Sequence, residues 1–231
     1  MRQAMVEIFE AYQTDDDVRV LVMCGAGDKA FVSGADISEF KEKRDDAAAA
    51  AQYAEISARS TAAMEAFEKP IIAMIQGFCI GGGLATALGA DIRIASDDSQ
   101  FGIPAAKLGL GYNYQYLRKL TDVVGPALAS EILFVGRRMD AQRALSIGLV
   151  NTVVSVDELE DTVLSLAGEI ATNAPLTIKA SKETIKQIRK DDKVRDHALV
   201  EQLIKNCFDS DDYKEGRAAF GEKRTPKFRG T

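Results

Sequence analysis

The sequence predicts a layered α/β protein whose strands pair largely in parallel. Three short, mostly apolar runs, at residues 18–24, 71–75 and 91–95, have the composition of buried strands. Segments with helical spacing of apolar residues separate these runs, and parallel neighbours need such crossover connections. With 231 residues, of which 46% are hydrophobic and 28% charged, the chain is large enough for one substantial packed domain.

Helices are expected where apolar residues recur every three or four positions. The first covers residues 2–14, and a long alanine-rich helix covers 47–67 and ends before Pro70. The later elements are expected in this order: a helix entered through the glycines of GGGLATALGA, a helix after Gly125 with Pro126 in its first turn, a strand at 149–156, and three amphipathic helices from Asp157 onward, broken near 173–175 and 191–192.

Charge and residue usage exclude several classes of protein. The chain has 35 acidic and 29 basic residues, a formal charge of −6, so its field does not attract the phosphates of nucleic acid. His197 is the only histidine and is expected on a helix surface, which argues against a Ser/His/Asp triad; the sequence has no cluster of Cys/His metal ligands. There is no Walker phosphate loop and no dinucleotide glycine spacing, so we expect no metal and no permanently bound cofactor.

The uncharged segment from Ile71 to Ala90 is not expected to cross a membrane. Five glycines and Gln76 within it, with Pro70 just before it, favour a strand, a tight turn and a buried helix. The N-terminal residues lack the apolar run of a signal peptide. Three cysteines are an odd number in a chain that does not need disulfides to fold, so we expect a reduced, cytoplasmic protein.

Two loops rich in small residues follow expected strands, in the stretches 21–37 and 71–92. Small residues let a ligand approach main-chain N–H groups closely, and two N–H groups that face one point form an oxyanion hole. The same glycines can instead serve only tight turns and close helix packing, so both interpretations stand at this stage.

Five stretches of the sequence, taken in order, carry a family resemblance. They are KAFVSGADISEF at 29–40, KPIIAMIQGFCIGGGL at 69–84, ADIRIASDDSQFGIPAAKLGL at 90–110, GRRMDAQRALSIGLVNTVV at 136–154 and EGRAAFGEKRTPKF at 215–228. With these motifs the whole chain resembles the enoyl-CoA hydratase/isomerase family of the crotonase superfamily. The resemblance implies a crotonase-like spiral of ββα units at 1–156, a C-terminal helical trimerisation segment at 157–231, and a homotrimer or a hexamer of two trimers.

The resemblance also implies a lyase that acts on acyl-CoA thioesters, with coenzyme A as part of the substrate. Members of the family hold the thioester oxygen with two backbone N–H groups, which here match Ala35 and Gly82. Fixed N–H dipoles stabilise the negative charge that develops on this oxygen as an enolate forms. The residues implied to bind CoA are Lys29, Ala30, Ser33, Asp36 and Ile37 in one loop, with Phe220 and Lys223 reaching the CoA of a neighbouring subunit.

Two alanines depart from the family's pattern at positions that matter for chemistry. Hydratases of the family place one glutamate after the GGG and another after the FGxP stretch, where this chain has Ala85 and Ala105. An alanine cannot transfer a proton, so hydration by the two-glutamate route lacks its acid and its base here. The alternatives are a malonyl-type acyl-CoA decarboxylase and a catalytically inert acyl-CoA-binding protein.

Tyr112 is the candidate to act in place of the glutamates. The order G-Y-N at 111–113 resembles the methylmalonyl-CoA decarboxylase branch, in which a tyrosine orients the departing carboxylate, although that branch has a histidine where Ala35 stands. Loss of carbon dioxide forms an enolate without a general base. A packed aromatic residue at the pocket rim is an equally good interpretation of Tyr112.

The beginning of the sequence is a second departure. The family's opening strand pair and its N-P-x-x-R-N-A-L segment, which helps to bind CoA, do not precede the first helix here. Either the natural start lies upstream of Met1 or this version exposes a strand edge.

Overall fold

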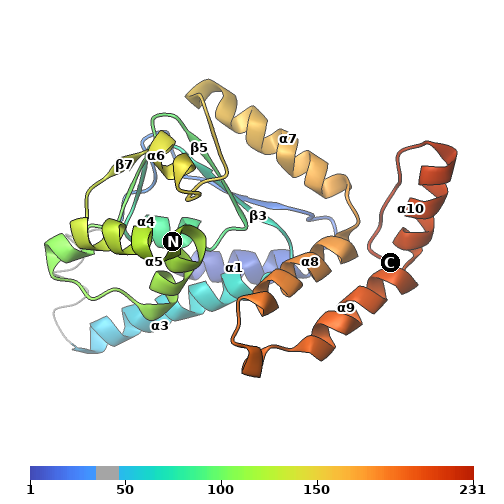
Figure 1. The fold of residues 1–231 in the computed structure, drawn as a ribbon, viewed down its shortest axis with the longest axis horizontal. Helices are drawn as coiled ribbons and strands as arrows, with labels where there is room; N and C mark the ends of the chain where they lie inside the picture. Colours follow the sequence, from blue (N-terminus) through green and yellow to red (C-terminus); the bar gives the residue numbers. More distant parts are fainter. Residues whose placement is uncertain (35–46) are drawn as a thin grey trace.

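The computed structural model describes residues 1–34 and 47–231, and it shows two sheets wound into a spiral with helices around them (Figure 1). Along the chain, a strand of one sheet is followed by a strand of the other and then by a helix. This repeat is the spiral of ββα units that the family resemblance implies, and the α/β fold class predicted from the sequence pattern is confirmed.

The first sheet contains the strands that the sequence predicts best. All its strands are parallel, in the order β1-β3-β5-β8. The expected strand at 18–24 is shorter and only half-buried, because β1 lies at the edge of the sheet and pairs with β3 alone. The bounds are β1 (Leu21–Met23), β3 (Ile71–Ile75), β5 (Ile92–Ser96) and β8 (Thr152–Val154).

The second sheet is built from strands of two or three residues. Its order is β2-β4-β6-β7, with the first three parallel and β7 antiparallel to β6. Strands this short carry too few residues for an alternating pattern, which is why the sequence did not resolve them individually. Their bounds are β2 (Ala30–Val32), β4 (Phe78–Ile80), β6 (Gln100–Gly102) and β7 (Met139–Asp140).

The helices of the core lie where the periodicity predicts them. In α5, Gly125 has non-helical backbone angles and Pro126 begins the second half, so the expected helix after Gly125 is confirmed and preceded by a further stretch from Tyr114. The helix α1 packs along α3 (Figure 1). The bounds are α1 (Arg2–Gln13), α3 (Ala47–Ala66), α4 (Gly82–Ala87), the 3₁₀ helix η1 (Ala105–Leu108), α5 (Tyr114–Val135) and α6 (Ala141–Ser146).

The C-terminal part contains four α-helices where the sequence predicts three. The hydroxyl of Ser210 accepts a hydrogen bond from the backbone N–H of Tyr213 and caps α10, and this cap divides the last expected helix in two. Figure 1 shows α9 and α10 extending away from the sheets. The bounds are η2 (Val156–Glu158), α7 (Leu159–Thr172), α8 (Pro175–Ile188), η3 (Asp192–Val194), α9 (His197–Asp209) and α10 (Asp211–Glu222).

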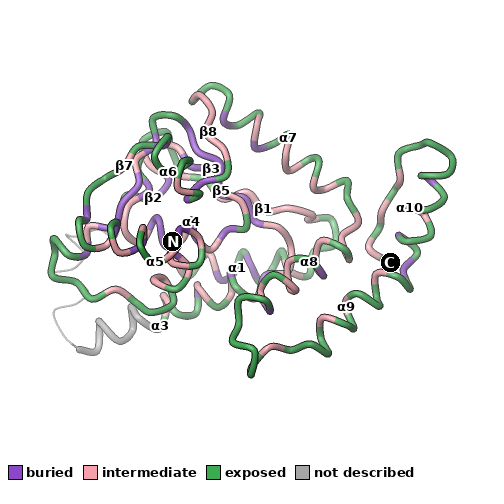
Figure 2. Tube along the Cα trace, viewed as in Figure 1, coloured by how far each residue is buried: buried purple, intermediate pink, exposed green. Residues whose placement is uncertain are grey.

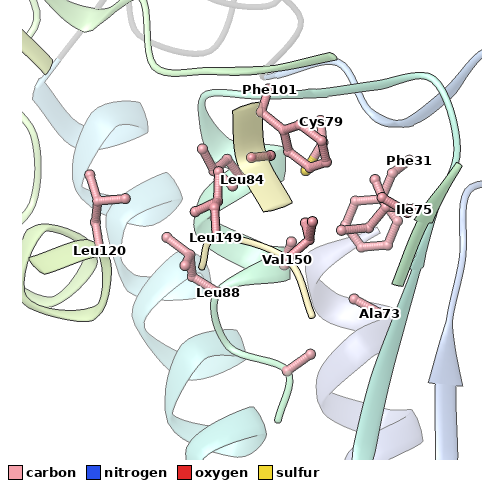
Figure 3. Packing of buried hydrophobic residues seen from close by; sticks show 14 of the residues in the cluster. Phe31, Ala73, Ile75, Cys79, Leu84, Leu88, Phe101, Leu120, Leu149 and Val150 are labelled. Atoms are coloured by element: carbon pink, nitrogen blue, oxygen red, sulfur yellow. The ribbon is translucent and has the colours of Figure 1, made fainter. Parts of the chain in front are cut away.

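Buried residues lie in both sheets (Figure 2), and the main hydrophobic cluster takes residues from both of them. Successive side chains of β3 point to opposite faces, so Ala73 and Ile75 join the main cluster while Ile72 packs in a second cluster with Leu159 and Val163 of α7. Figure 3 shows the packing of the main cluster around α4 and the neighbouring strands. Burial on both faces explains the uninterrupted apolar run of β3.

The structure also bears on the uncharged segment, the histidine and the cysteines that the sequence singled out. The uncharged segment from Ile71 to Ala90 forms β3, β4 and α4, as predicted. Within the part of the chain that the structure describes, no helix combines the length and apolar character needed to cross a membrane. His197 is exposed at the start of α9, and the three cysteines are free thiols.

Candidate active site

A cavity of about 500 Å³ opens at the carboxyl edge of the second sheet. Because β2, β4 and β6 are parallel, the segments that follow them meet at this edge, where ligands commonly bind in α/β proteins. The wall is completed by α1, α3 and the start of α5. The residues that line it are Arg2, Ser33, Gly34, Ser57, Ala58, Thr61, Ala62, Glu65, Ile80, Gly81, Gly82, Ile103, Pro104, Ala105, Leu108, Leu110, Gly111, Tyr112, Asn113, Gln115 and Tyr116.

Gly81, Gly82 and Gly83 follow β4 at the cavity, and a glycine is needed at two of these positions for different structural reasons. Gly81 has a positive φ of 57°, which side-chain-bearing residues rarely adopt. A Cβ on Gly83 would overlap the carbonyl oxygen of Val32 and lie 2.8 Å from the Val32 Cβ. Gly82 has neither constraint, since the nearest atom to an added Cβ is Nη2 of Arg2 at 3.8 Å.

Gly82 therefore differs from its neighbours in having no turn or packing requirement within the chain. It is the first residue of α4, so its N–H has no acceptor within the helix. It also lines the cavity. These are properties that a backbone donor to a bound ligand needs, and the oxyanion role of Gly82 stays a prediction.

Gly83→Ala is expected to lower the free energy of unfolding by about 1–3 kcal/mol, because the new methyl group overpacks the contact between α4 and Val32. Thermal unfolding followed by circular dichroism measures the change. Gly82→Ala is the matched control, because its methyl group meets only the flexible side chain of Arg2. Equal melting temperatures for the two variants would contradict the packing role of Gly83.

The second predicted donor, Ala35, lies outside the described residues, together with Asp36 and Ile37. The two residues before them, Ser33 and Gly34, line the cavity. A Cβ on Gly34 would lie 3.6 Å from the carbonyl oxygen of Ile80, so this loop runs beside the one that carries the three glycines. The structure thus brings together the two loops that the sequence selected.

The side chain of Tyr112 joins the cavity wall to the glycine loop. Its hydroxyl donates a hydrogen bond to the carbonyl oxygen of Gly81, at 2.9 Å. Burial raises the pKa of Tyr112 above its ordinary value, so the hydroxyl remains protonated at neutral pH and acts as a donor. In this position Tyr112 holds the residue that precedes Gly82.

Tyr116 lies four residues further along, in the first turn of α5, with its ring centre 6.0 Å from that of Tyr112. Its hydroxyl is 3.2 Å from Oγ of Ser57 and 3.2 Å from Oγ1 of Thr61. Burial raises the pKa of Tyr116, but hydrogen bonding with Ser57 and Thr61, together with the nearby charge of Arg2, outweighs burial and leaves the pKa below its ordinary value. Tyr114, the third tyrosine of this segment, is 71% exposed and is not among the lining residues.

The sequence did not identify the polar residues that α1 and α3 contribute. Ser57 and Thr61 are four positions apart, so they share one face of α3, and Arg2 begins α1. The polar residues Ser57 and Thr61 interrupt a helix face that otherwise packs inward, and this interruption could have indicated a polar site. Both helices were predicted, but their meeting at the cavity was not.

The two alanines at the family's glutamate positions are both buried. Ala105 begins η1, is 7% exposed and lines the cavity, whereas Ala85 is 3% exposed within α4. Among the described lining residues, Glu65 is the only carboxylate, and its Oε1 is paired with Nζ of Lys119 at 2.9 Å. Apart from Glu65, the described wall offers no carboxylate for proton transfer.

The remaining predicted CoA-binding residues are not gathered at the cavity within one chain. Phe220 is 88% exposed on α10, and Lys223 ends that helix with a φ of 55°, on the opposite side of the molecule from α5 (Figure 1). Lys29 is exposed just before β2, and Ala30 is the first residue of that strand. Contacts of Phe220 and Lys223 with a neighbouring subunit's CoA stay a prediction.

Fold and cavity together define an α/β protein of the crotonase fold, with a ligand site at the carboxyl ends of short parallel strands. The chain belongs to the enoyl-CoA hydratase/isomerase family, whose family model matches residues 1–231.

Individual relatives agree with this assignment. The chain is 36% identical to the short-chain-enoyl-CoA hydratase of Clostridium acetobutylicum, over 92% of this chain and 80% of that protein. It is 34% identical to the crotonyl-CoA hydratase of Syntrophomonas wolfei, over 98% of this chain and 88% of that protein. The crystal structure of an enoyl-CoA hydratase/carnithine racemase from Magnetospirillum magneticum matches with a TM-score of 0.94 and 37% identity, covering 100% of this chain and 86% of that one.

Proposed function

We propose that this protein is a lyase that processes an acyl-CoA thioester through an enolate, with the thioester oxygen held by the N–H groups of Gly82 and Ala35. The substrate class rests on the family and on the names of its relatives, which are CoA-thioester hydratases. Coenzyme A is then part of the substrate. No other cofactor enters the proposal.

The observation that carries the proposal is Gly82 itself. It lines the cavity, its N–H lies at the start of α4, and neither its backbone angles nor its packing requires a glycine. A fixed N–H dipole at this position stabilises negative charge on an oxygen without having to reorient during the reaction. Removing one such donor typically lowers turnover by about 10²- to 10³-fold.

Decarboxylation is the second candidate, and the cavity wall favours it. Ala105 supplies no carboxylate, and Glu65 is paired with Lys119. When a malonyl-type carboxylate leaves as carbon dioxide, the electron pair of the broken C–C bond forms the enolate, and no general base is needed. Tyr112 donates to the loop that carries Gly82 and supports the same oxyanion site.

The test is to incubate the purified protein separately with crotonyl-CoA and with methylmalonyl-CoA. Thioester absorbance follows hydration of the first, and carbon dioxide release follows decarboxylation of the second. Turnover of either substrate supports an enolate-forming enzyme and distinguishes the two reactions. Binding of CoA without turnover of either substrate would support the inert acyl-CoA-binding protein instead.

Tyr112→Phe is expected to lower turnover of the preferred substrate by about 10- to 100-fold, because the loop before Gly82 loses the hydrogen bond that positions it. Free CoA should bind nearly as before. Tyr114→Phe is the matched control, since Tyr114 lies only two residues further along, at the exposed start of α5. If Tyr112→Phe equals the parent in kcat, KM and CoA affinity, Tyr112 is a packing residue only.

We also propose that the chain assembles as a homotrimer or as a hexamer of two trimers through its C-terminal helices. Apolar side chains gather on this part of the chain in exposed positions: Ile204 is 46%, Phe208 59% and Phe220 88% exposed. A group of exposed apolar residues of this kind marks an interaction surface. Light scattering of the purified protein measures its mass in solution, and a monomer would contradict the proposal.

A further inference from the structure

Three hydroxyl groups meet on the wall of the cavity. The Tyr116 oxygen lies 3.2 Å from Oγ of Ser57 and 3.2 Å from Oγ1 of Thr61, and all three residues line the cavity. The Thr61 hydroxyl also donates to the carbonyl oxygen of Ser57, at 3.0 Å. Since a threonine hydroxyl has a single proton, Thr61 is the acceptor toward Tyr116, and Ser57 is left to donate to the Tyr116 oxygen. The hydroxyls therefore form a chain that supplies Tyr116 with a proton donor.

The chain of hydroxyls lies close to the loop proposed to bind the thioester oxygen. The Tyr116 ring centre is 6.0 Å from that of Tyr112, and the Tyr112 hydroxyl bonds the carbonyl oxygen of Gly81 at 2.9 Å. Gly82, the next residue, lines the same cavity as Tyr116. The α-carbon of a thioester enolate is two bonds from the oxygen. An oxygen bound at Gly82 therefore holds this carbon in the part of the cavity that the two tyrosines border.

Tyr116 is also the side chain best suited to give up a proton among the described residues that line the cavity. The Tyr112 proton is engaged by a backbone carbonyl group, and the Glu65 carboxylate is paired with Lys119. A guanidinium does not release its proton, which excludes Arg2. The other polar groups of this wall are amides and aliphatic hydroxyls, which are far weaker acids than a phenol.

The surroundings of Tyr116 favour release of its proton more than those of Tyr112 do. Burial raises the pKa of both tyrosines. For Tyr116, hydrogen bonding with Ser57 and Thr61 contributes to leaving the pKa below its ordinary value. The same hydrogen bonds stabilise the phenolate that a proton transfer leaves behind. Tyr112, whose pKa stays raised, is the weaker acid of the two.

We propose that Tyr116 is a further catalytic residue, whose hydroxyl gives the proton that the α-carbon of the enolate takes up. The electron pair of the enolate C=C bond forms the new C–H bond, while the O–H bond of Tyr116 breaks and leaves a phenolate. The phenolate regains a proton through the Ser57 hydroxyl. In hydration this proton comes from the water molecule that adds, and in decarboxylation it comes from solvent water, which is left as hydroxide. The proposal rests on the proposed function, because it takes the reaction to pass through a thioester enolate.

The test is to run the reaction in heavy water with whichever of crotonyl-CoA and methylmalonyl-CoA the parent turns over. Uptake of deuterium makes the α-carbon of the product stereogenic, and NMR of the product coupled to a chiral alcohol gives its configuration. Reactions are kept short relative to the exchange of the substrate's α-proton, which is measured without protein. A deuteron delivered by one side chain reaches one face of the enolate, so the parent should yield a single configuration.

Tyr116→Phe should lower turnover by about 10²-fold, the lower end of the range for general acid catalysis. Its residual product should contain both configurations, because water then protonates the enolate. Ser57→Ala tests the same step without changing the tyrosine, and it should lower turnover by about 10-fold, the effect of one hydrogen bond, while one configuration is kept. Tyr114→Phe is the matched control, because Tyr114 is 71% exposed and is not among the lining residues.

Melting temperatures establish that each variant is folded. A folded Tyr116→Phe variant that yields one configuration would overturn the proposal alone: at the parent's rate Tyr116 is not needed, and at a lower rate it is a positioning residue. Both configurations from the parent would overturn it as well, and so would a Ser57→Ala variant that turns over as fast as the parent. If the parent turns over neither substrate, the proposed function fails and this proposal fails with it.

Discussion

Replacing Ala85 and Ala105 together by glutamate is expected to raise the rate of crotonyl-CoA hydration by about 10²- to 10⁴-fold, the usual contribution of general acid–base catalysis. The family's hydratases carry glutamates at these positions. Ala105 already lines the cavity, so a longer side chain there begins at its wall. The substitutions add a proton donor and acceptor and leave the proposed backbone donors unchanged.

The double change to glutamine is the matched control. It has nearly the same size and cannot exchange a proton at neutral pH, so it should hydrate crotonyl-CoA no faster than the parent. Ala85 is buried in α4, and a carboxylate there is partly desolvated, so melting temperatures of all variants should be measured. The single variant Ala105→Glu separates the effect of the cavity wall from that of α4.

Two outcomes would contradict the expectation. An unmodified protein that hydrates crotonyl-CoA at about 10 s⁻¹, a rate typical of enzymes, would show that the alanines do not limit the reaction. A folded double glutamate variant that is no faster than its glutamine counterpart would show that the cavity cannot place water for attack.

The sequence predicts two kinds of element well: strands that are buried on both faces, and helices that bury one apolar stripe. The run Ile71–Ile75 is apolar throughout because packed layers cover both of its faces, and its bounds were predicted without error. The short strands β2, β4, β6 and β7 escaped individual prediction because their pairing depends on contacts far along the chain. The split between α9 and α10 depends on one serine cap.

The candidate site also contains features that the local sequence indicates and features that only tertiary contacts create. The row of glycines after a strand is a local signal for a turn of small residues, but Gly82 was selected from that row by the family resemblance alone. The local sequence could not say which glycine is needed for packing, since that follows from the contact of Gly83 with β2. Arg2 and Tyr116 come from helices far apart in the chain, so no local pattern could place them together at one cavity wall.

Gly82→Pro is expected to lower turnover by about 10²- to 10³-fold, because it removes the N–H proposed to bind the thioester oxygen. The substitution is unusually mild at this position. Proline is favoured as the first residue of a helix, where its missing N–H is not needed by the helix. The preceding residue, Gly81, has a ψ of −115°, outside the α region that proline disfavours before it.

Gly82→Ala is the control that makes the measurement specific. It adds a methyl group in much the same place but keeps the N–H, and its nearest neighbour is the flexible Arg2 side chain at 3.8 Å. With the preferred substrate, we expect the alanine variant to retain most of the parent's kcat/KM and the proline variant to lose it, while both melt near the parent. If both variants lose turnover equally, space at Gly82 matters and its N–H does not. If a folded Gly82→Pro variant keeps the parent's turnover, the N–H of Gly82 is not an oxyanion donor.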